Sequence, residues 1–140
     1  MLVFYIFKVR TLKGGDATWK TYKIIFWKEV NTLRTLKFII DKQIIKPDPK
    51  CDFSGLIPGT SGYLKAEFSF SSEWNGCNKV AAFYSVMGKE YPPQVLDDGK
   101  TCIIPEEALA GKKFKVRVIG KNEKQKITTN KLTVCQKGGV

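Results

Sequence analysis

Short segments of alternating apolar and polar residues, separated by turn residues, fill residues 64–134 and constrain the fold of this chain more than any other feature. Phe114, Val116 and Val118, for example, alternate with Lys115 and Arg117. A β-strand with this pattern buries one face and exposes the other, as the strands of antiparallel sandwiches do. The pattern therefore predicts an all-β fold.

The spacing of these segments indicates which all-β fold to expect. Turn signals such as Asn75-Gly76 recur roughly every eight to twelve residues, and Pro105 and Gly111 enclose a predicted one-turn helix. Residues 47–62 form a loop long enough to suspect function or mobility. The number and spacing of segments predict an immunoglobulin-like antiparallel β-sandwich. Its expected strands are 36–45, 63–70, 79–87, 91–96, 101–104, 112–120 and 127–135.

Residues 1–35 have the character of a separate arm. Segments 2–12 and 18–28 are rich in β-branched and aromatic residues, and Gly14-Gly15-Asp16 lies between them, which predicts a β-hairpin. A hairpin alone is marginally stable in water, so this one is expected to lie on the main body or on a neighbouring subunit. The sequence thus predicts an N-terminal hairpin extension, residues 1–35, followed by a sandwich domain, residues 36–140.

The second strand of the predicted hairpin mixes aromatic residues with lysines, and its candidate partner-binding residues are Trp19, Tyr22, Phe26 and Trp27. Three interpretations stay open. The strand packs within the protomer, it completes a sheet on another subunit by strand addition, or it binds single-stranded nucleic acid by stacking and charge.

Trp74 is a further candidate, because it follows a predicted strand directly and precedes a turn. Tryptophan often anchors interfaces, so its ring could contact a partner. The alternative is that it caps the end of the sandwich core and donates its indole N–H to a loop carbonyl.

The charge of the chain favours acidic partners. Twenty-four basic and thirteen acidic residues give a net charge of +11, which suits nucleic acid, an acidic polymer or an acidic protein surface. Residues 1–35 contribute seven basic and two acidic side chains, so the excess is spread along the chain. The most basic predicted hairpin spans residues 112–126, and it either docks on an acidic surface or is simply solvated.

The sequence offers little to build a catalytic or metal site. It has no histidine, no nucleophile elbow and no phosphate-binding glycine loop. Its four cysteines contain no Cys-x-x-Cys pair, which disfavours zinc. The acidic pairs Asp97-Asp98 and Glu106-Glu107 suit a turn and a helix start. We therefore expect no catalytic, cofactor-binding or metal-binding residues, and no enzyme activity.

The apolar run at residues 2–7 is too short to cross a membrane and lacks the flanking features of a secretory signal. No membrane association is expected. The protein is expected to be made in a reducing cytoplasm.

Four segments carry a resemblance to a known family: "LKFIIDKQII", "YLKAEFSFSSEWNGCNKVAAF", "VLDDGKTCIIPEEAL" and "FKVRVIGKNEKQKITTNKLTV". Through these four segments, residues 36–140 resemble small virion-associated proteins, of the head-fibre or decoration kind, from phages that infect Clostridium-like Firmicutes. Residues 1–35 fall outside the family pattern, which carries no catalytic residues.

The resemblance implies a non-enzymatic virion accessory protein, used in capsid decoration, at a fibre base or in tail or baseplate attachment. Its partners would be phage capsid or tail proteins, and it would be a homo-oligomer or present in many copies on the particle. The alternative is a phage-encoded inhibitor or single-stranded nucleic-acid-binding protein that acts inside the host.

Overall fold

The computed structural model describes the backbone of residues 2–13, 16–29 and 33–136, with side chains from residue 33 onward. The chain divides into two compact units, Met1–Leu33 and Arg34–Val140. Strand β3 begins at Arg34, the first residue of the second unit.

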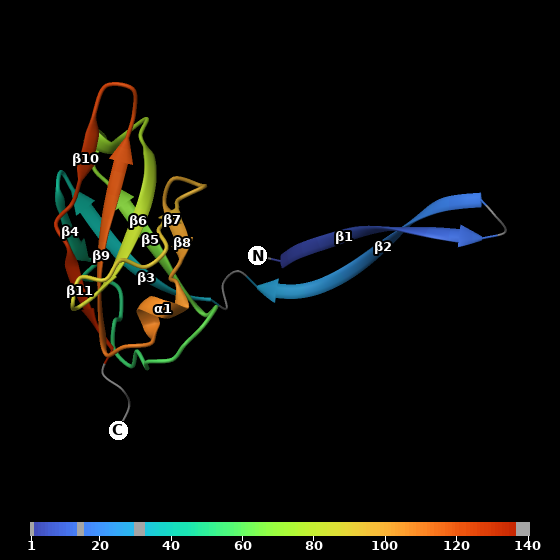
Figure 1. Cartoon of the computed structure of the whole chain (residues 1–140), viewed down its shortest axis with the longest axis horizontal. Helices are drawn as coiled ribbons and strands as arrows, with labels where there is room; N and C mark the ends of the chain where they lie inside the picture. The colour runs from blue at the N-terminus through green and yellow to red at the C-terminus, as the bar shows by residue number, and fades with distance from the viewer. Residues whose placement is uncertain (1, 14–15, 30–32, 137–140) are drawn as a thin grey trace. The chain divides into compact units, whose positions relative to one another are not determined.

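The first unit is a two-stranded antiparallel ribbon, which confirms the predicted N-terminal hairpin (Figure 1). Its strands are β1 (Leu2–Lys13) and β2 (Asp16–Glu29). They pair continuously from Lys13 opposite Asp16 to Tyr5 opposite Ile24, and the register then shifts before Val3 pairs with Lys28. Of the turn predicted between the strands, Gly14 and Gly15 lie outside the described residues.

The second unit is an all-β sandwich of two sheets, as predicted (Figure 1). The β3–β5 sheet has the order β4 (Ile44–Pro47), β3 (Arg34–Asp41), β5 (Leu64–Phe70), β8 (Thr101–Ile103). The β6–β9 sheet has the order β10 (Lys126–Thr128), β9 (Lys113–Lys121), β6 (Asn78–Ser85), β7 (Gln94–Val95), and β11 (Leu132–Cys135) also pairs with β9. The short helix α1 (Glu106–Leu109) lies where Pro105 and Gly111 predict it.

The core lies between the two sheets and is made by the apolar positions of the alternating strands. Phe114, Val116 and Val118 of β9 are fully buried, whereas Lys115 and Arg117 between them are only half-buried. The β3–β5 sheet contributes Phe38 and Phe68, whose rings stack with centroids 5.3 Å apart. Alternation in the sequence thus predicts correctly which face of these strands is buried.

Two predicted strands are each divided in the structure. The predicted strand 36–45 is a hairpin of β3 and β4, in which Asp41 pairs with Ile44 around a turn at Lys42. Lys42 has a φ of 56°, a left-handed conformation that is uncommon for a residue with a side chain. The predicted strand 127–135 is likewise divided into β10 and β11, which both pair with β9.

One strand pair departs from the antiparallel pattern. Strands β3 and β5 run parallel, with Arg34 opposite Leu64 and Phe38 opposite Phe68. Parallel neighbours need a connection that carries the chain back to the starting end of the sheet. Strand β4 and residues 48–63 provide this return, which is why the long loop exists.

Candidate functional site

The four aromatic candidates of the arm all lie on β2. Trp19 pairs with Arg10 and Tyr22 pairs with Phe7 in the regular part of the ribbon. Phe26 and Trp27 lie in the irregular stretch, where the register shifts between Val3 and Tyr5 of β1. A bulge of this kind increases twist and interrupts pairing. The structure describes the backbone of these positions, so their role as partner-binding residues stays a prediction.

Trp74 belongs to the core. It ends a 3₁₀ turn, Ser72–Trp74, and its side chain is fully buried at one end of the sandwich. The indole Nε1–H donates to the carbonyl oxygen of Lys42 at 2.8 Å, and the ring packs against Phe70 with centroids 5.3 Å apart. The core alternative therefore describes Trp74, and its prediction as a partner-binding residue is wrong because its ring is not accessible to a partner.

The long loop is hydrogen-bonded to the first residue of β3. The guanidinium of Arg34 donates to the carbonyl oxygens of Asp52, Ser54 and Gly55. Hydrogen bonds from Ser54, together with the charge of Arg34, hold the pKa of the Asp52 carboxyl below its ordinary value. Arg34 thus fixes the middle of the loop directly beside the start of β3.

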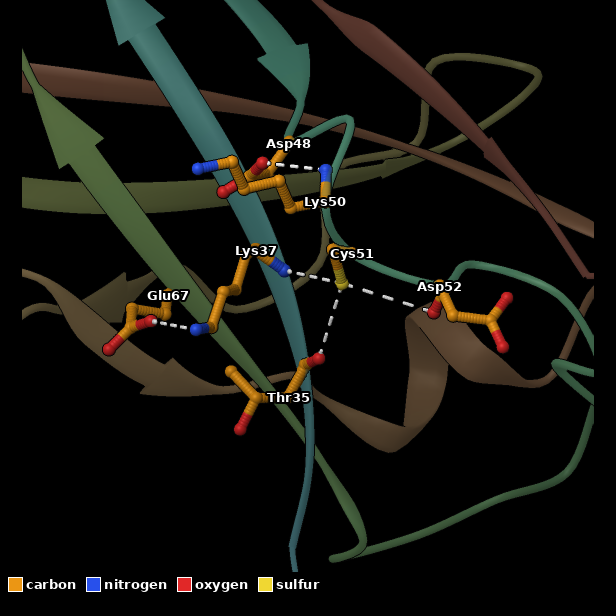
Figure 2. A network of polar contacts seen from close by, with 7 residues as sticks. All are labelled: Thr35, Lys37, Asp48, Lys50, Cys51, Asp52 and Glu67. Carbon is orange, nitrogen blue, oxygen red and sulfur yellow. Dashed lines mark hydrogen bonds and ion pairs between the residues drawn. The ribbon is translucent and has the colours of Figure 1, made fainter.

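Cys51 forms a second attachment of the same loop, shown in Figure 2. Its thiol lies 3.6 Å from the carbonyl oxygen of Thr35 and accepts a hydrogen bond from the backbone N–H of Lys37 at 3.4 Å. The Lys37 ammonium forms an ion pair with Glu67 at 3.8 Å on the neighbouring strand. These contacts give Cys51 a structural role at the junction of loop and sheet.

The outward face of the β6–β9 sheet is strongly basic. Residues 113, 115, 117 and 121 of β9 are Lys, Lys, Arg and Lys, and they alternate with buried positions. Tyr84 of β6 stands opposite Lys115 of β9 in the sheet register. Its ring lies under two cations, Lys131 at 4.1 Å and Arg117 at 5.5 Å from the ring centroid. The sequence identified the basic hairpin 112–126. It did not identify Tyr84 or Lys131, because their meeting depends on cross-strand register.

A shallow groove of about 980 Å³ lies on this same face. Val80 and Ala82 of β6 and Ile119 of β9 line it, with Glu90 and Glu123 among its other residues. Val80 is directly opposite Ile119 in the sheet register, so the two strands form a common apolar floor. Cations and apolar side chains therefore share one surface.

The acidic pairs have structural roles. The Asp98 carboxylate accepts hydrogen bonds from the backbone N–H groups of Lys100 and Thr101 and closes the turn before β8. Burial opposes ionisation of Asp98, but the Thr101 hydroxyl and these N–H groups lower its pKa overall. Glu106, at the start of α1, accepts a hydrogen bond from the Ser61 hydroxyl at 2.9 Å.

All four cysteines are free, namely Cys51, Cys77, Cys102 and Cys135. Burial, aided by the Asp98 carboxylate, raises the pKa of the Cys102 thiol to about 12. Cys135, by contrast, is exposed at the end of β11. In the part of the chain that the structure describes, no cluster of His, Cys, Asp and Glu has the makings of a metal site.

None of the helices formed by the described residues is both long enough and apolar enough to span a membrane. Comparisons with protein-family models, with curated proteins and with solved structures find no match to this chain.

Proposed function

We propose that this protein is a non-enzymatic docking protein that joins a larger assembly through its N-terminal ribbon. The observation that carries the proposal is the architecture of the first unit. Its sheet has only two strands, β1 and β2, of 12 and 14 residues. Each strand therefore has one long edge that is not hydrogen-bonded within that sheet, and such edges are templates for pairing with another chain.

The stability of the ribbon supports the same proposal. A two-stranded sheet is marginal in water, whereas three or more strands with a shared apolar face are stable. Addition to a sheet of a second copy, or of another protein, would supply the missing strands. Trp19, Tyr22, Phe26 and Trp27 are the residues proposed to fill the new interface, because large aromatic side chains dominate the energetics of many interfaces.

We further propose that the assembly is a phage particle. The resemblance of residues 36–140 to virion-associated proteins supports this step, in capsid decoration, at a fibre base or in tail or baseplate attachment. The chain would be made in the cytoplasm of the host bacterium and incorporated into the virion. Many copies on a symmetric particle would hold firmly even if each contact is weak, because linked contacts act at a high effective concentration.

Deletion of residues 1–33 tests the role of the ribbon. The remaining chain, 34–140, is a compact unit with its own core and is expected to stay folded and monomeric. The full chain is expected to oligomerise or to bind purified particles, and the truncated chain to do neither. Light scattering after size-exclusion chromatography and cosedimentation with particles are the measurements. Precipitation of the truncated chain would mean that the ribbon belongs to the core of the protomer.

A full-length variant tests the aromatic side chains separately from the backbone of the ribbon. In it, Trp19, Tyr22, Phe26 and Trp27 are replaced by threonine, which keeps strand propensity but removes the aromatic surface. It is expected to lose assembly as the deletion does. Retained assembly would assign the interaction to the backbone edge alone. Mass spectrometry of purified particles, searching for this chain in stoichiometric amounts, tests the phage assignment separately.

The second candidate function is binding of single-stranded nucleic acid, or inhibition of a host process, inside the infected cell. The net charge of +11 and the aromatic and lysine residues interleaved on β2 favour it. Affinity for a thymidine oligonucleotide, measured across a salt series, separates the two candidates. A nucleic-acid binder loses affinity steeply with salt because each neutralised phosphate releases a counterion. Absence of binding at low salt would eliminate this candidate.

A further inference from the structure

The outward face of the β6–β9 sheet, called here the basic face, has a composition that the rest of the sandwich lacks. The strands β6, β7, β9, β10 and β11 contain no Asp or Glu at all. The cations of the basic face are Lys113, Lys115, Arg117, Lys121, Lys126 and Lys131. By contrast, the outward residues of the β3–β5 sheet mix both signs, with Lys37, Lys46 and Lys65 beside Asp41 and Glu67.

The charges of the basic face are not balanced by ion pairs within residues 33–136. Lys121 of β9 stands directly opposite Lys126 of β10 in the sheet register. Like charges in this position destabilise a sheet, since the two side chains share one face. Among residues 33–136, the ion pair Lys37–Glu67 lies on the other sheet, and no acidic side chain pairs with Lys121 or Lys126. A partner that brings negative charge would relieve this repulsion.

The groove on this face is suited to apolar side chains. Its floor of Val80, Ala82 and Ile119 lies between the cations of β9 and the segment that contains Glu90 and Pro93. Val95, on the adjoining strand β7, is 62% exposed. Burial of such a floor is favourable for an apolar side chain and brings nothing to a phosphate group.

Two further observations favour a protein over a nucleic acid as the occupant. The ring of Tyr84 is only 5% exposed beneath Lys131 and Arg117, so it is not available for stacking with a base. Glu90 and Glu123 line the groove itself, where their carboxylates disfavour any anionic group and leave the groove to the apolar side chains of a partner. A second copy of this sandwich is a poor occupant of this face too, because the outward residues of one sheet mix both charge signs and those of the other are basic.

From this combination we infer that the basic face is a docking surface for an acidic and partly apolar surface of a different protein, with apolar side chains in the groove and carboxylates on the lysines. The inference rests on the proposed docking function and adds a second contact to it. The ribbon joins the protein to its assembly by strand addition, whereas the basic face selects an acidic partner. The two contacts use different units of the chain and are testable separately.

Peptide binding to the full-length protein tests the inference. The probes are a labelled 12-residue peptide of alternating Glu and Val, a peptide of the same charge with alternating Glu and Ser, and a thymidine 12-mer, all followed by fluorescence anisotropy. The Glu–Val peptide is expected to bind at least about fivefold more tightly than the Glu–Ser peptide, because only the former fills the groove. Equal affinities for the two peptides, or tighter binding of the oligonucleotide, would overturn the inference.

Matched charge variants locate the contact. The variant Lys113→Gln, Lys121→Gln, Lys126→Gln removes three exposed cations from the basic face. The control Lys37→Gln, Lys46→Gln, Lys65→Gln removes the same charge from the other sheet. The first is expected to weaken binding of the Glu–Val peptide by about tenfold, and the control by less than about threefold. Equal weakening in both would mean that net charge alone attracts the peptide.

A third variant tests the groove, and the truncated chain separates this inference from the proposed function. Replacement of Val80 and Ile119 by threonine is expected to abolish the preference for the Glu–Val over the Glu–Ser peptide, since threonine keeps strand propensity but adds a hydroxyl. A preference for the Glu–Val peptide that survives in this variant would contradict the assigned site.

The chain 34–140 is expected to bind the Glu–Val peptide with the same affinity as the full-length protein. This affinity does not depend on whether the full-length protein assembles in the ribbon experiments.

Discussion

Gly120 and Trp74 meet so closely that no side chain fits between them. A Cβ atom at Gly120 would lie 2.8 Å from both Cε3 and Cζ3 of the Trp74 ring and 3.2 Å from Cβ of Cys77. Carbon atoms in van der Waals contact are about 3.5–4.0 Å apart. The indole therefore packs directly on the backbone of β9, and the hydrogen bond from its N–H to Lys42 ties β9 to the β3–β4 turn. Three segments far apart in the sequence depend on this one contact.

Replacement of Gly120 by alanine is expected to destabilise the sandwich by about 1–3 kcal/mol, the usual cost of overpacking a filled core. The measurement is urea unfolding followed by circular dichroism. Gly111→Ala is the matched control, because a Cβ there meets only the Lys113 carbonyl oxygen at 3.7 Å. That control should change stability by less than about 0.5 kcal/mol. Equal stability of the two variants would contradict the packing described.

The variant Trp74→Phe keeps an aromatic ring but loses the indole N–H. The Lys42 carbonyl oxygen then has no donor, and the smaller ring leaves a cavity. Together these effects are expected to cost about 2–4 kcal/mol. Differential scanning calorimetry of the chain 34–140 measures the loss in the isolated sandwich. An unchanged melting temperature would show that the hydrogen bond and the packing at this end contribute little to stability.

Arg34 is predicted to hold the long loop in place. In the variant Arg34→Ala, the carbonyl oxygens of Asp52, Ser54 and Gly55 lose their shared donor, at a cost of about 1 kcal/mol, because the contacts are near solvent. The expected result is faster proteolysis within residues 50–57, measured by mass spectrometry of a limited digest, with the strands still protected. Lys37→Ala, which removes only the surface ion pair with Glu67, is the control and should leave cleavage unchanged. Uniform cleavage across the sandwich would mean global unfolding instead.

Cys102 and Cys135 should differ in reactivity. With a pKa of about 12, the Cys102 thiol is about one part in ten thousand thiolate at pH 8. Iodoacetamide is therefore expected to label the exposed Cys135 well before Cys102, as read by peptide mass spectrometry. In 8 M urea, as a reference condition, the two should react at similar rates. Rapid labelling of Cys102 in the folded protein would show that its strand opens readily.

The raised pKa of Cys102 also predicts a pH dependence of stability. The folded state keeps the thiol protonated up to a higher pH than the unfolded chain does, so the neutral thiol stabilises the fold below the unfolded value of 9.0. This contribution is lost as the pH rises from about 9 toward about 12. The difference in free energy of unfolding between wild type and Cys102→Ala is expected to shrink over that range, since other titrating groups cancel in the comparison. A constant difference would contradict the shift.

The alternating pattern predicted the sandwich because burial of one strand face is a local property of the sequence. Phe114, Val116 and Val118 could be assigned to the core without knowing which strands lie beside them. The relative direction of two neighbouring strands is not determined by this pattern. The same alternation suits a parallel and an antiparallel neighbour, so nothing in strands β3 and β5 could predict that they run in the same direction.

The division of residues 36–45 into two strands was missed because the turn lacks its usual residues. Lys42 adopts a left-handed conformation that glycine or asparagine would normally mark, and the Trp74 hydrogen bond supports it from outside the local sequence. The same limitation applies to the basic face. Its lysines could be read from the sequence, but the cation–π contact between Lys131 and the Tyr84 ring depends on strand register.

Arg34 is the first residue of a strand that is bonded to β5 from its first residue and to β4 over its second half. Tension that reaches this residue along the strand axis would act on the β3–β5 ladder in shear, so its hydrogen bonds would have to break together rather than one after another. A sandwich that is tethered through such a strand resists extraction better than one held by a terminal edge strand that peels away. In the proposed docking through the N-terminal ribbon, the parallel pair would bear the load that the assembly places on the sandwich.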